Sequence, residues 1–152
     1  IYNMTGSTPS AWNDPVKGGE LTKAQVSQGA DVVYHAAGGT GVGVLQAAAD
    51  AGILGIGVDK NQNHLHPGKV LTSMVKRVDT GVHDSFKAGA DLAGGFATLS
   101  LANGGISYSM DEHNVGLVTK AMVDAVEKAK AHIISGELKV HDYMSDSSCP
   151  VK

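Results

Sequence analysis

Apolar and polar positions along the chain fall into alternating blocks of strand length and helix length. The strand-like blocks are four short segments, at residues 1–4, 31–37, 53–58 and 70–75. Near-continuous apolar runs such as 31–37 are typical of strands in a sheet that is covered on both faces. We expect the strands at 31–37, 53–58 and 70–75 to be parallel neighbours in one sheet.

Helix-forming segments lie between these strands. Asp14 followed by Pro15 predicts a helix start, because aspartate caps free N–H groups and proline suits the first helical position. Gly29 is the natural stop for that helix. Further helices are predicted at 44–51, 79–92 and 115–135, and weaker strands at 96–101, 106–109 and 138–140. Strand–helix–strand units with short glycine turns predict an α/β fold with a doubly wound, mostly parallel sheet.

Composition narrows the class of protein. The chain has 152 residues, 42% of them hydrophobic and 18% charged, which is typical of a soluble globular domain. A net charge of -3 offers no basic surface, so we expect no nucleic-acid partner. The chain opens inside a predicted strand without an initiating methionine, so we expect sequence to precede it. The single cysteine, Cys149, is either a solvent-facing thiol in a polar tail or the partner of a cysteine elsewhere.

A glycine-rich segment at 38–43 follows one predicted strand and opens a helix. Glycines let the backbone approach a ligand, and a helix N-terminus favours electronegative atoms. Asp59 stands 20 residues after Gly39, at the tip of the next strand, where a carboxylate can hold ribose hydroxyls. The glycine spacing of the nicotinamide-dinucleotide fingerprint fails, because Val44 or Gln46 stands at its third position. A ligand-binding turn and a turn needed only for packing both remain open.

Ligands of doubly wound sheets bind beyond the carboxyl ends of the strands. Lys76 ends a predicted strand at this rim, and we expect it to pair with Asp59 and donate to a ligand oxygen. The aromatic residues nearest the rim have two open roles, ligand stacking and core packing. The candidate site residues are Trp12, Tyr34, Gly38, Gly39, Asp59 and Lys76.

Signals for catalysis are poor. His64 and His66 share a loop, but nothing nearby supplies the third and fourth ligands of a zinc site. His35, inside an apolar strand, is predicted to be a hydrogen-bonded core or pocket-edge residue rather than a base. Neither a Gly-x-Ser-x-Gly elbow nor a Gly-Lys-Ser/Thr phosphate loop is present. We expect a binding protein without enzyme activity, metal or cofactor.

Several blocks resemble a known family. GADVVYHAAGGTGVGVLQAAADAGILGIGVDKNQ (29–62) and PGKVLTSMVKRVD (67–79) look like the BMP, or PnrA-like, family of basic membrane lipoproteins. WNDPVKGGEL (12–21) and IISGELKV (133–140) fit the same family in the same order. These proteins are substrate-binding components of ABC transporters with the two-lobed fold of type I periplasmic binding proteins.

The resemblance implies a domain plan. Residues 1–76 would form the core of the C-terminal ligand-binding lobe, 77–140 would be crossover helices and strands shared between lobes, and 141–152 a polar tail. The N-terminal lobe would be missing from this chain. Helices after Lys76 would then lack their native neighbour and expose apolar surface.

The resemblance also implies a function, namely capture of a small molecule, usually a purine nucleoside, for delivery to a membrane permease. Gly38 and Gly39 would line the base or sugar, Asp59 would hold the ribose hydroxyls, and Lys76 would contact the 5′ side. Tyr34 stands where the family usually has phenylalanine. We expect a periplasmic or cell-surface protein, lipid-anchored through the missing N-terminus. A nucleotide-cofactor enzyme domain and a ligand-sensing domain of a regulator are the alternatives.

Overall fold

The computed structural model describes Met4 and residues 8–148, so the strand predicted at 1–4 lies outside the described residues except for Met4. The chain divides into two compact units, the first ending at Val118 and the second beginning at Thr119. The regular elements of the first unit are η1 Pro9–Trp12, α1 Pro15–Ser27, β1 Val32–Tyr34, η2 Gly38–Thr40, α2 Gly41–Asp50, β2 Leu54–Gly57, η3 Asn63–Leu65, β3 Val70–Lys76, α3 Val78–Ala88, η4 Gly89–Asp91 and β4 Ile106–Tyr108. Those of the second unit are α4 Lys120–Ser135 and α5 Tyr143–Asp146.

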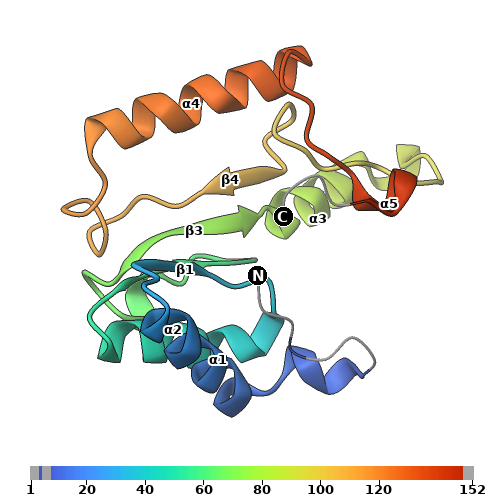
Figure 1. Cartoon of the computed structure of the whole chain (residues 1–152). Coiled ribbons are helices and arrows are strands. Elements are labelled where there is room, and N and C mark those ends of the chain that lie inside the picture. Colours follow the sequence, from blue (N-terminus) through green and yellow to red (C-terminus); the bar gives the residue numbers. More distant parts are fainter. Residues whose placement is uncertain (1–3, 5–7, 149–152) are drawn as a thin grey trace. The chain divides into compact units, whose positions relative to one another are not determined.

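The first unit is built on a four-stranded sheet with the order β1-β2-β3-β4 (Figure 1). β1 pairs with β2 and β2 pairs with β3, both in parallel, so the predicted parallel neighbours are confirmed. β4 pairs with β3 in the antiparallel sense, between Met74 and Tyr108 at one end and Lys76 and Ile106 at the other. The chain therefore has the predicted α/β fold with a mostly parallel sheet.

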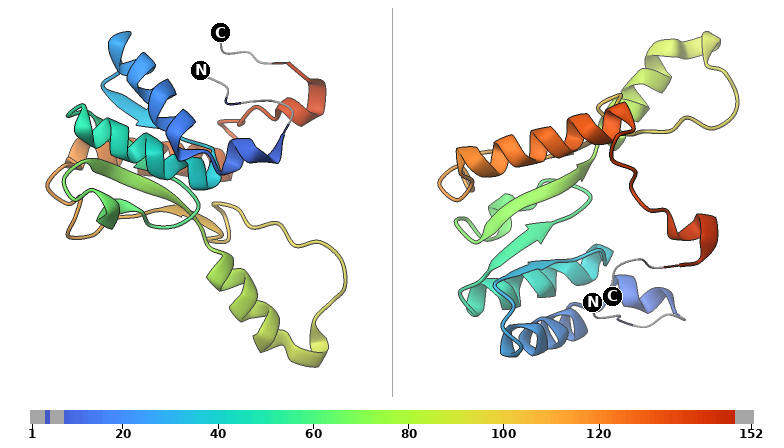
Figure 2. Two further views of the ribbon diagram at one scale, coloured as in Figure 1. Left: turned by 90° about the horizontal axis from the view of Figure 1, so that it is seen from below. Right: turned by 45° about the horizontal axis from the view of Figure 1, so that its top comes forward.

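Helices α1 and α2 form a layer on this sheet, with α2 next to β1 and β2 and α1 packed on α2 (Figure 2). The apolar core lies between α2 and the strands. Its buried members are Val33, Leu45, Ala47, Ala48, Val58 and Val70. Burial of aliphatic side chains on this scale is the main force that holds α2 against the sheet.

The predicted first helix is confirmed at both ends. The Asp14 carboxylate accepts a hydrogen bond from the Lys17 N–H at 2.9 Å, and Pro15 occupies the first helical position. The helix ends at Ser27, two residues before Gly29, which has a positive φ of 92°. Because the N-terminus of α1 is capped in this way, its start lies at a defined place beside the glycine turn of η2.

Two predicted strands are wrong, and one predicted helix begins later than expected. Residues 96–101 form no strand, because the Asn103 side chain bonds to Ser100 N and Thr98 O and so takes backbone groups that a strand would pair. Residues 138–140 form no strand either, since Leu138 N–H donates back to the end of α4 at His132 O. The last long helix begins at Lys120 rather than at residue 115.

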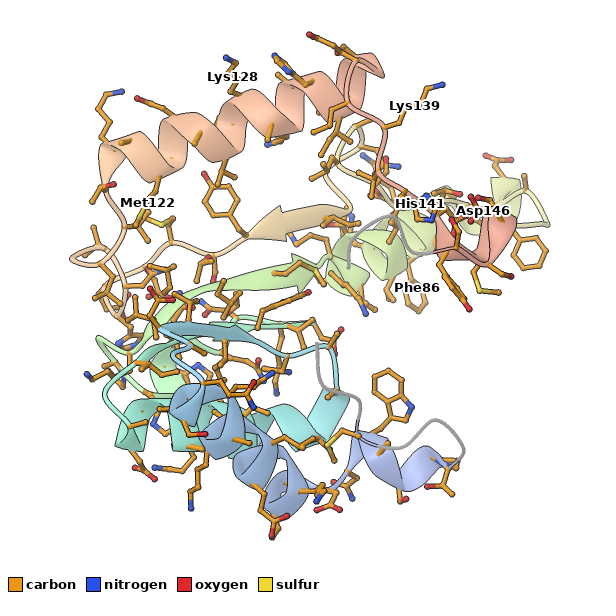
Figure 3. The ribbon with its side chains drawn as sticks, in the orientation of Figure 1. Phe86, Met122, Lys128, Lys139, His141 and Asp146 are labelled. Carbon is orange, nitrogen blue, oxygen red and sulfur yellow. The ribbon has the colours of Figure 1, made fainter. Side chains whose placement is uncertain are left out.

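The late start of α4 has a local cause. Thr119 has extended backbone angles and its hydroxyl accepts a hydrogen bond from Met122 N–H at 3.2 Å, as an N-cap does. Residues 112–117 form turns, and Asn114 among them is fully buried. No residue of α4 is buried, and Met122 and Lys128 project from opposite sides of the helix (Figure 3). None of the helices in the described residues is both long and apolar enough to cross a membrane.

Candidate ligand-binding site

A groove of about 700 Å³ lies at the carboxyl ends of β2 and β3, beside the start of α2. Four of the six predicted site residues line it, namely Gly38, Gly39, Asp59 and Lys76. The other lining residues are Val42, Val58, Lys60, Asn61, Gln62, Val75, Arg77, Val78 and Asp79. The groove therefore occupies the place where open α/β sheets bind ligands.

Asp59 and Lys76 form an ion pair at the edge of the groove, and this predicted contact is confirmed. Lys76 Nζ lies 2.7 Å from Asp59 Oδ1, and the Lys76 N–H donates to the Asp59 carbonyl at 2.9 Å. The hydrogen bond from Lys76 to the Asp59 carboxylate, with the charge of that carboxylate, raises the pKa of Lys76 above its ordinary value. Both side chains remain about half exposed, so carboxylate and ammonium are still accessible from the groove.

The glycine turn serves two purposes at different positions. Gly41 and Gly43 make close approaches, because a methyl group added at Gly41 would overlap the ring of His35 and one at Gly43 would overlap Pro15 O. These two glycines let α2 pack against β1 and α1. Gly38 and Gly39 instead line the groove. The packing interpretation is therefore correct for Gly41 and Gly43, whereas ligand binding by Gly38 and Gly39 stays a prediction.

Thr40 locks this turn to the chain before α1. Its hydroxyl donates to Ala11 O at 2.7 Å and accepts from Asp14 N–H at 2.8 Å, and the side chain is fully buried. This bridge places Trp12 next to Gly38, where a methyl group would lie 3.2 Å from Trp12 O. Trp12 and Tyr34 do not line the groove and are 60% and 53% exposed. Neither aromatic is a core residue in the described chain, so their role as ligand contacts remains a prediction.

A buried polar network lies beneath the groove, and sequence reasoning missed it. Gln62, Asn63 and Ser73 are all nearly or fully buried, although two of them belong to a segment predicted as a polar loop. Ser73 Oγ accepts from Gln62 N–H at 3.0 Å and donates to Asn63 Oδ1 at 2.9 Å. Gln62 Oε1 in turn accepts from Val58 N–H at 2.9 Å. Polar residues in a loop carry no periodic pattern that would reveal their burial.

The network ends on an acidic anchor at Asp111. Its Oδ2 accepts from Asn61 Nδ2 and Asn63 Nδ2, and its Oδ1 from His113 N–H. The hydrogen bond from Asn61 is the main cause that lowers the pKa of Asp111 below its ordinary value. Asn114 Nδ2 donates to Leu71 O in β3 and to Ser109 O just after β4, which fixes the segment that contains Asp111 to these strands. The loop that follows Asp59 is therefore held by the hydrogen bonds of Asn61 and Asn63 to Asp111.

The described residues offer no alternative metal centre, since no group of three or more His, Cys, Asp or Glu side chains among them could hold an ion. His64 is exposed, whereas His35 is 5% exposed and its Nε2 lies 3.2 Å from Gln62 Oε1. The prediction of a hydrogen-bonded core histidine is confirmed. Burial lowers the pKa of His35, and the bond to Gln62 and the Asp59 charge oppose this effect.

Curated relatives share long stretches with this chain. The chain is 35% identical over 151 residues to the ABC transporter nucleoside-binding protein BmpA of Lactococcus lactis, covering 86% of this chain and 41% of that protein. It is also 35% identical to a CD4+ T-cell-stimulating antigen of Listeria monocytogenes, covering 82% of this chain and 39% of the antigen. The chain thus spans about two fifths of the length of these relatives.

Solved structures have the same fold. A solute-binding protein of an ABC transporter system from Aeropyrum pernix matches with a TM-score of 0.73 and 26% identity, over 88% of this chain and 47% of the other. A transcriptional activator of the comK gene from Bacillus halodurans matches with a TM-score of 0.75 and 25% identity, over 87% and 46%. A family model described as ABC transporter substrate-binding protein PnrA-like matches residues 6–143. The chain therefore belongs to the PnrA-like family of ABC transporter substrate-binding proteins.

Proposed function

We propose that the groove is one wall of a ligand site that captures a small molecule, most favourably a purine nucleoside, for an ABC importer. The observation that carries this proposal is the Asp59–Lys76 pair, which stands accessible at the edge of a strand-end groove. An ionised carboxylate has about four acceptor positions, and the ion pair occupies one oxygen. Asp59 Oδ2 is left to accept from neighbouring hydroxyls such as those of a ribose.

The remaining groove surface suits a nucleoside better than an anionic cofactor. Gly38 and Gly39 bring the backbone to the groove without side chains, while Val42 and Val58 supply apolar surface for a base. A dinucleotide would need close backbone approach at later glycines of the turn. Those glycines, Gly41 and Gly43, are covered by His35 and Pro15. The cofactor-enzyme alternative therefore receives no support from the turn.

The groove is open to solvent on one side, and we propose that a second lobe closes it. The lengths of the relatives support this plan, because each has a stretch of comparable size or larger that this chain does not cover. The protein would then act outside the cytoplasm, at the periplasmic or cell-surface side, lipid-anchored through its N-terminal segment. It would pass its ligand to a membrane permease and carry out no reaction.

A ligand-sensing domain of a regulator is the second candidate. The observation that favours it is the fold match to a protein described as a transcriptional activator, at 25% identity. The two candidates share the groove and differ in what precedes it. Sequencing the gene upstream distinguishes them, since an importer component requires a signal peptide with a lipidated cysteine and a regulator requires a DNA-binding segment.

The binding site is tested by Asp59→Ala in the two-lobed protein. Loss of the carboxylate leaves ribose hydroxyls unpaired in a closed cleft, at about 1–3 kcal/mol for each group. We therefore expect guanosine and adenosine to bind roughly ten- to a thousand-fold more weakly, with free guanine and adenine little affected. Titration calorimetry of the wild type and the variant with these four compounds measures the effect.

Two further variants serve as controls. Asp50→Ala removes a carboxylate from the last residue of α2, away from the groove, and should bind like the wild type. Asp59→Asn keeps a residue type that tolerates the positive φ of 70° at this position but removes the charge. If Asp59→Ala binds every nucleoside as tightly as the wild type does, the assignment of this site is wrong.

A further inference from the structure

Asp59 directly follows Val58, and the backbone N–H of Val58 is held by the side chain of Gln62. The N–H of Val58 is buried and donates to Gln62 Oε1 at 2.9 Å. Two residues later, Lys60 N–H turns back to Val58 O at 2.9 Å. The chain therefore makes a tight turn around Asp59, with Gln62 as the side chain that fixes where the turn begins.

The same oxygen of Gln62 also faces His35, and this geometry sets the histidine tautomer. Because Val58 N–H can only donate, the Gln62 atom beside it is the carbonyl oxygen. His35 Nε2, 3.2 Å from that oxygen, must then carry its proton. His35 Nδ1 is left as an acceptor, and it is buried without a hydrogen-bond partner. The basic nitrogen of this tautomer is therefore Nδ1, which is buried rather than open to solvent.

His35 connects this arrangement to the glycine turn. A methyl group at Gly41 would overlap the imidazole, so the ring lies directly against the start of α2. Ser73 Oγ accepts from Gln62 N–H, which ties the same residue to β3 three residues before Lys76. Gln62 thus links His35 and Val58, the residues that follow β1 and β2, through its side chain, and it reaches Ser73 of β3 through its backbone N–H.

We propose that Gln62, supported by His35, is a positioning residue that aims the Asp59 carboxylate at the ligand and keeps it within reach of Lys76. This inference rests on the proposed function only where ligand binding is the readout. Gln62 lines the floor of the groove while being 6% exposed, so it acts mainly through Asp59 rather than as a primary ligand contact.

The test is a double-mutant cycle in the two-lobed protein with guanosine as the probe. Gln62→Met keeps the length of the side chain and removes the acceptor for Val58 and His35. We expect it to weaken guanosine binding about tenfold in the wild-type background and by less than about twofold when Asp59 is already alanine. His35→Gln, which retains a donor near the Nε2 position, should bind more tightly than His35→Leu. Equal effects of Gln62→Met in both backgrounds would overturn the proposal.

The matched control is Thr22→Val. Thr22 is 1% exposed and its hydroxyl donates to Gly18 O inside α1, so the variant also loses a buried hydrogen bond, but one outside the network. We expect its guanosine affinity to equal that of the wild type. If Thr22→Val loses as much guanosine affinity as Gln62→Met does, the effect of Gln62 is one of general stability and the proposal is wrong.

A second readout needs no ligand. The 15N resonances of the His35 ring should show a proton on Nε2, and the carbon-13 titration of Lys76 should move toward the ordinary lysine value in Gln62→Met but not in Thr22→Val. If the wild type binds no nucleoside, the proposed function fails while these resonances still decide the role of Gln62. A proton on Nδ1, or a Lys76 titration unchanged by Gln62→Met, contradicts it.

Discussion

Asp59 shows how much of the site depends on the conformation of one residue. Its φ of 70° lies in the left-handed region, where aspartate and asparagine are the most tolerated residues other than glycine. The carboxylate and the backbone angle are therefore selected together at this position. A hydrophobic residue here would lose the charge and also strain the turn, by about 1–2 kcal/mol.

His35 makes stability depend on pH at the scale of one side chain. Burial lowers its folded pKa below the ordinary value of 6.5, so the unfolded chain binds a proton that the native state does not. The contribution of neutral His35 is fully present above about pH 6.5 and is lost as the pH falls below it. We expect His35→Gln to lose less stability than the wild type between about pH 7.5 and pH 5. Urea unfolding at both pH values measures this, and equal losses would contradict it.

At the scale of elements, the contact between α1 and α2 depends on two glycines that behave differently. A methyl group at Gly43 would overlap Pro15 O, whereas one at Gly19, inside α1, would meet Gly43 O at 3.5 Å and Ala47 Cβ at 3.8 Å, ordinary contact distances. Gly19 therefore tolerates a side chain and Gly43 does not. Both residues lie within helices, so their helix propensities are comparable.

We expect Gly19→Ala to stabilise the protein by about 0.5–1 kcal/mol, because alanine favours the helix and fits the space. Gly43→Ala should destabilise it by about 3 kcal/mol or more, because backbone atoms must separate. Denaturant unfolding of the two variants gives the comparison. Similar effects of the two substitutions would mean that α1 and α2 do not pack as described.

Elements with local signals could be predicted from the sequence, and elements without them could not. Asp14 and Pro15 revealed the start of α1, and apolar runs revealed the three parallel strands. Thr119 caps α4 in a comparable way, but the helix-forming pattern extends back to residue 115 and so predicts too early a start. Asp59 and Lys76 could be placed together because parallel strands end at one rim. The burial of Gln62 could not be predicted, because it depends on contacts with His35 and Ser73 that no periodic pattern reveals.

At the scale of the whole molecule, the first unit has another groove, which is apolar. Of the residues that line it, only Val78 also lines the candidate ligand-binding groove. The apolar groove has a volume of about 500 Å³ beside α3. Its lining residues are Val78, Gly81, Val82, Ser85, Phe86, Gly89, Leu92 and Leu99. Phe86, labelled in Figure 3, is 83% exposed and Val78 is 63% exposed. Apolar surface of this kind marks an interaction site or a tendency to associate.

We expect the isolated chain to associate in solution and to bind a hydrophobic dye, because the α3 side chains Val78, Val82 and Phe86 are exposed in the part of the chain that the structure describes. Adding the proposed second lobe as a separate chain should suppress the dye signal and give a one-to-one complex. Size-exclusion chromatography with light scattering, together with dye fluorescence, measures both effects. A monodisperse, dye-silent monomer that unfolds cooperatively would count against the proposed domain plan.

The packing role of two glycines in the turn has a consequence for how this segment evolves. Gly41 and Gly43 are required by the packing of α2, whether or not a ligand ever binds. A descendant that lost its ligand would keep these two glycines, and the positive φ of 53° at Gly38 would continue to favour glycine there as well. The glycine-rich block thus marks common ancestry, and the proposed ligand contacts at Asp59 and Lys76 are the positions at which a change of ligand would be sought.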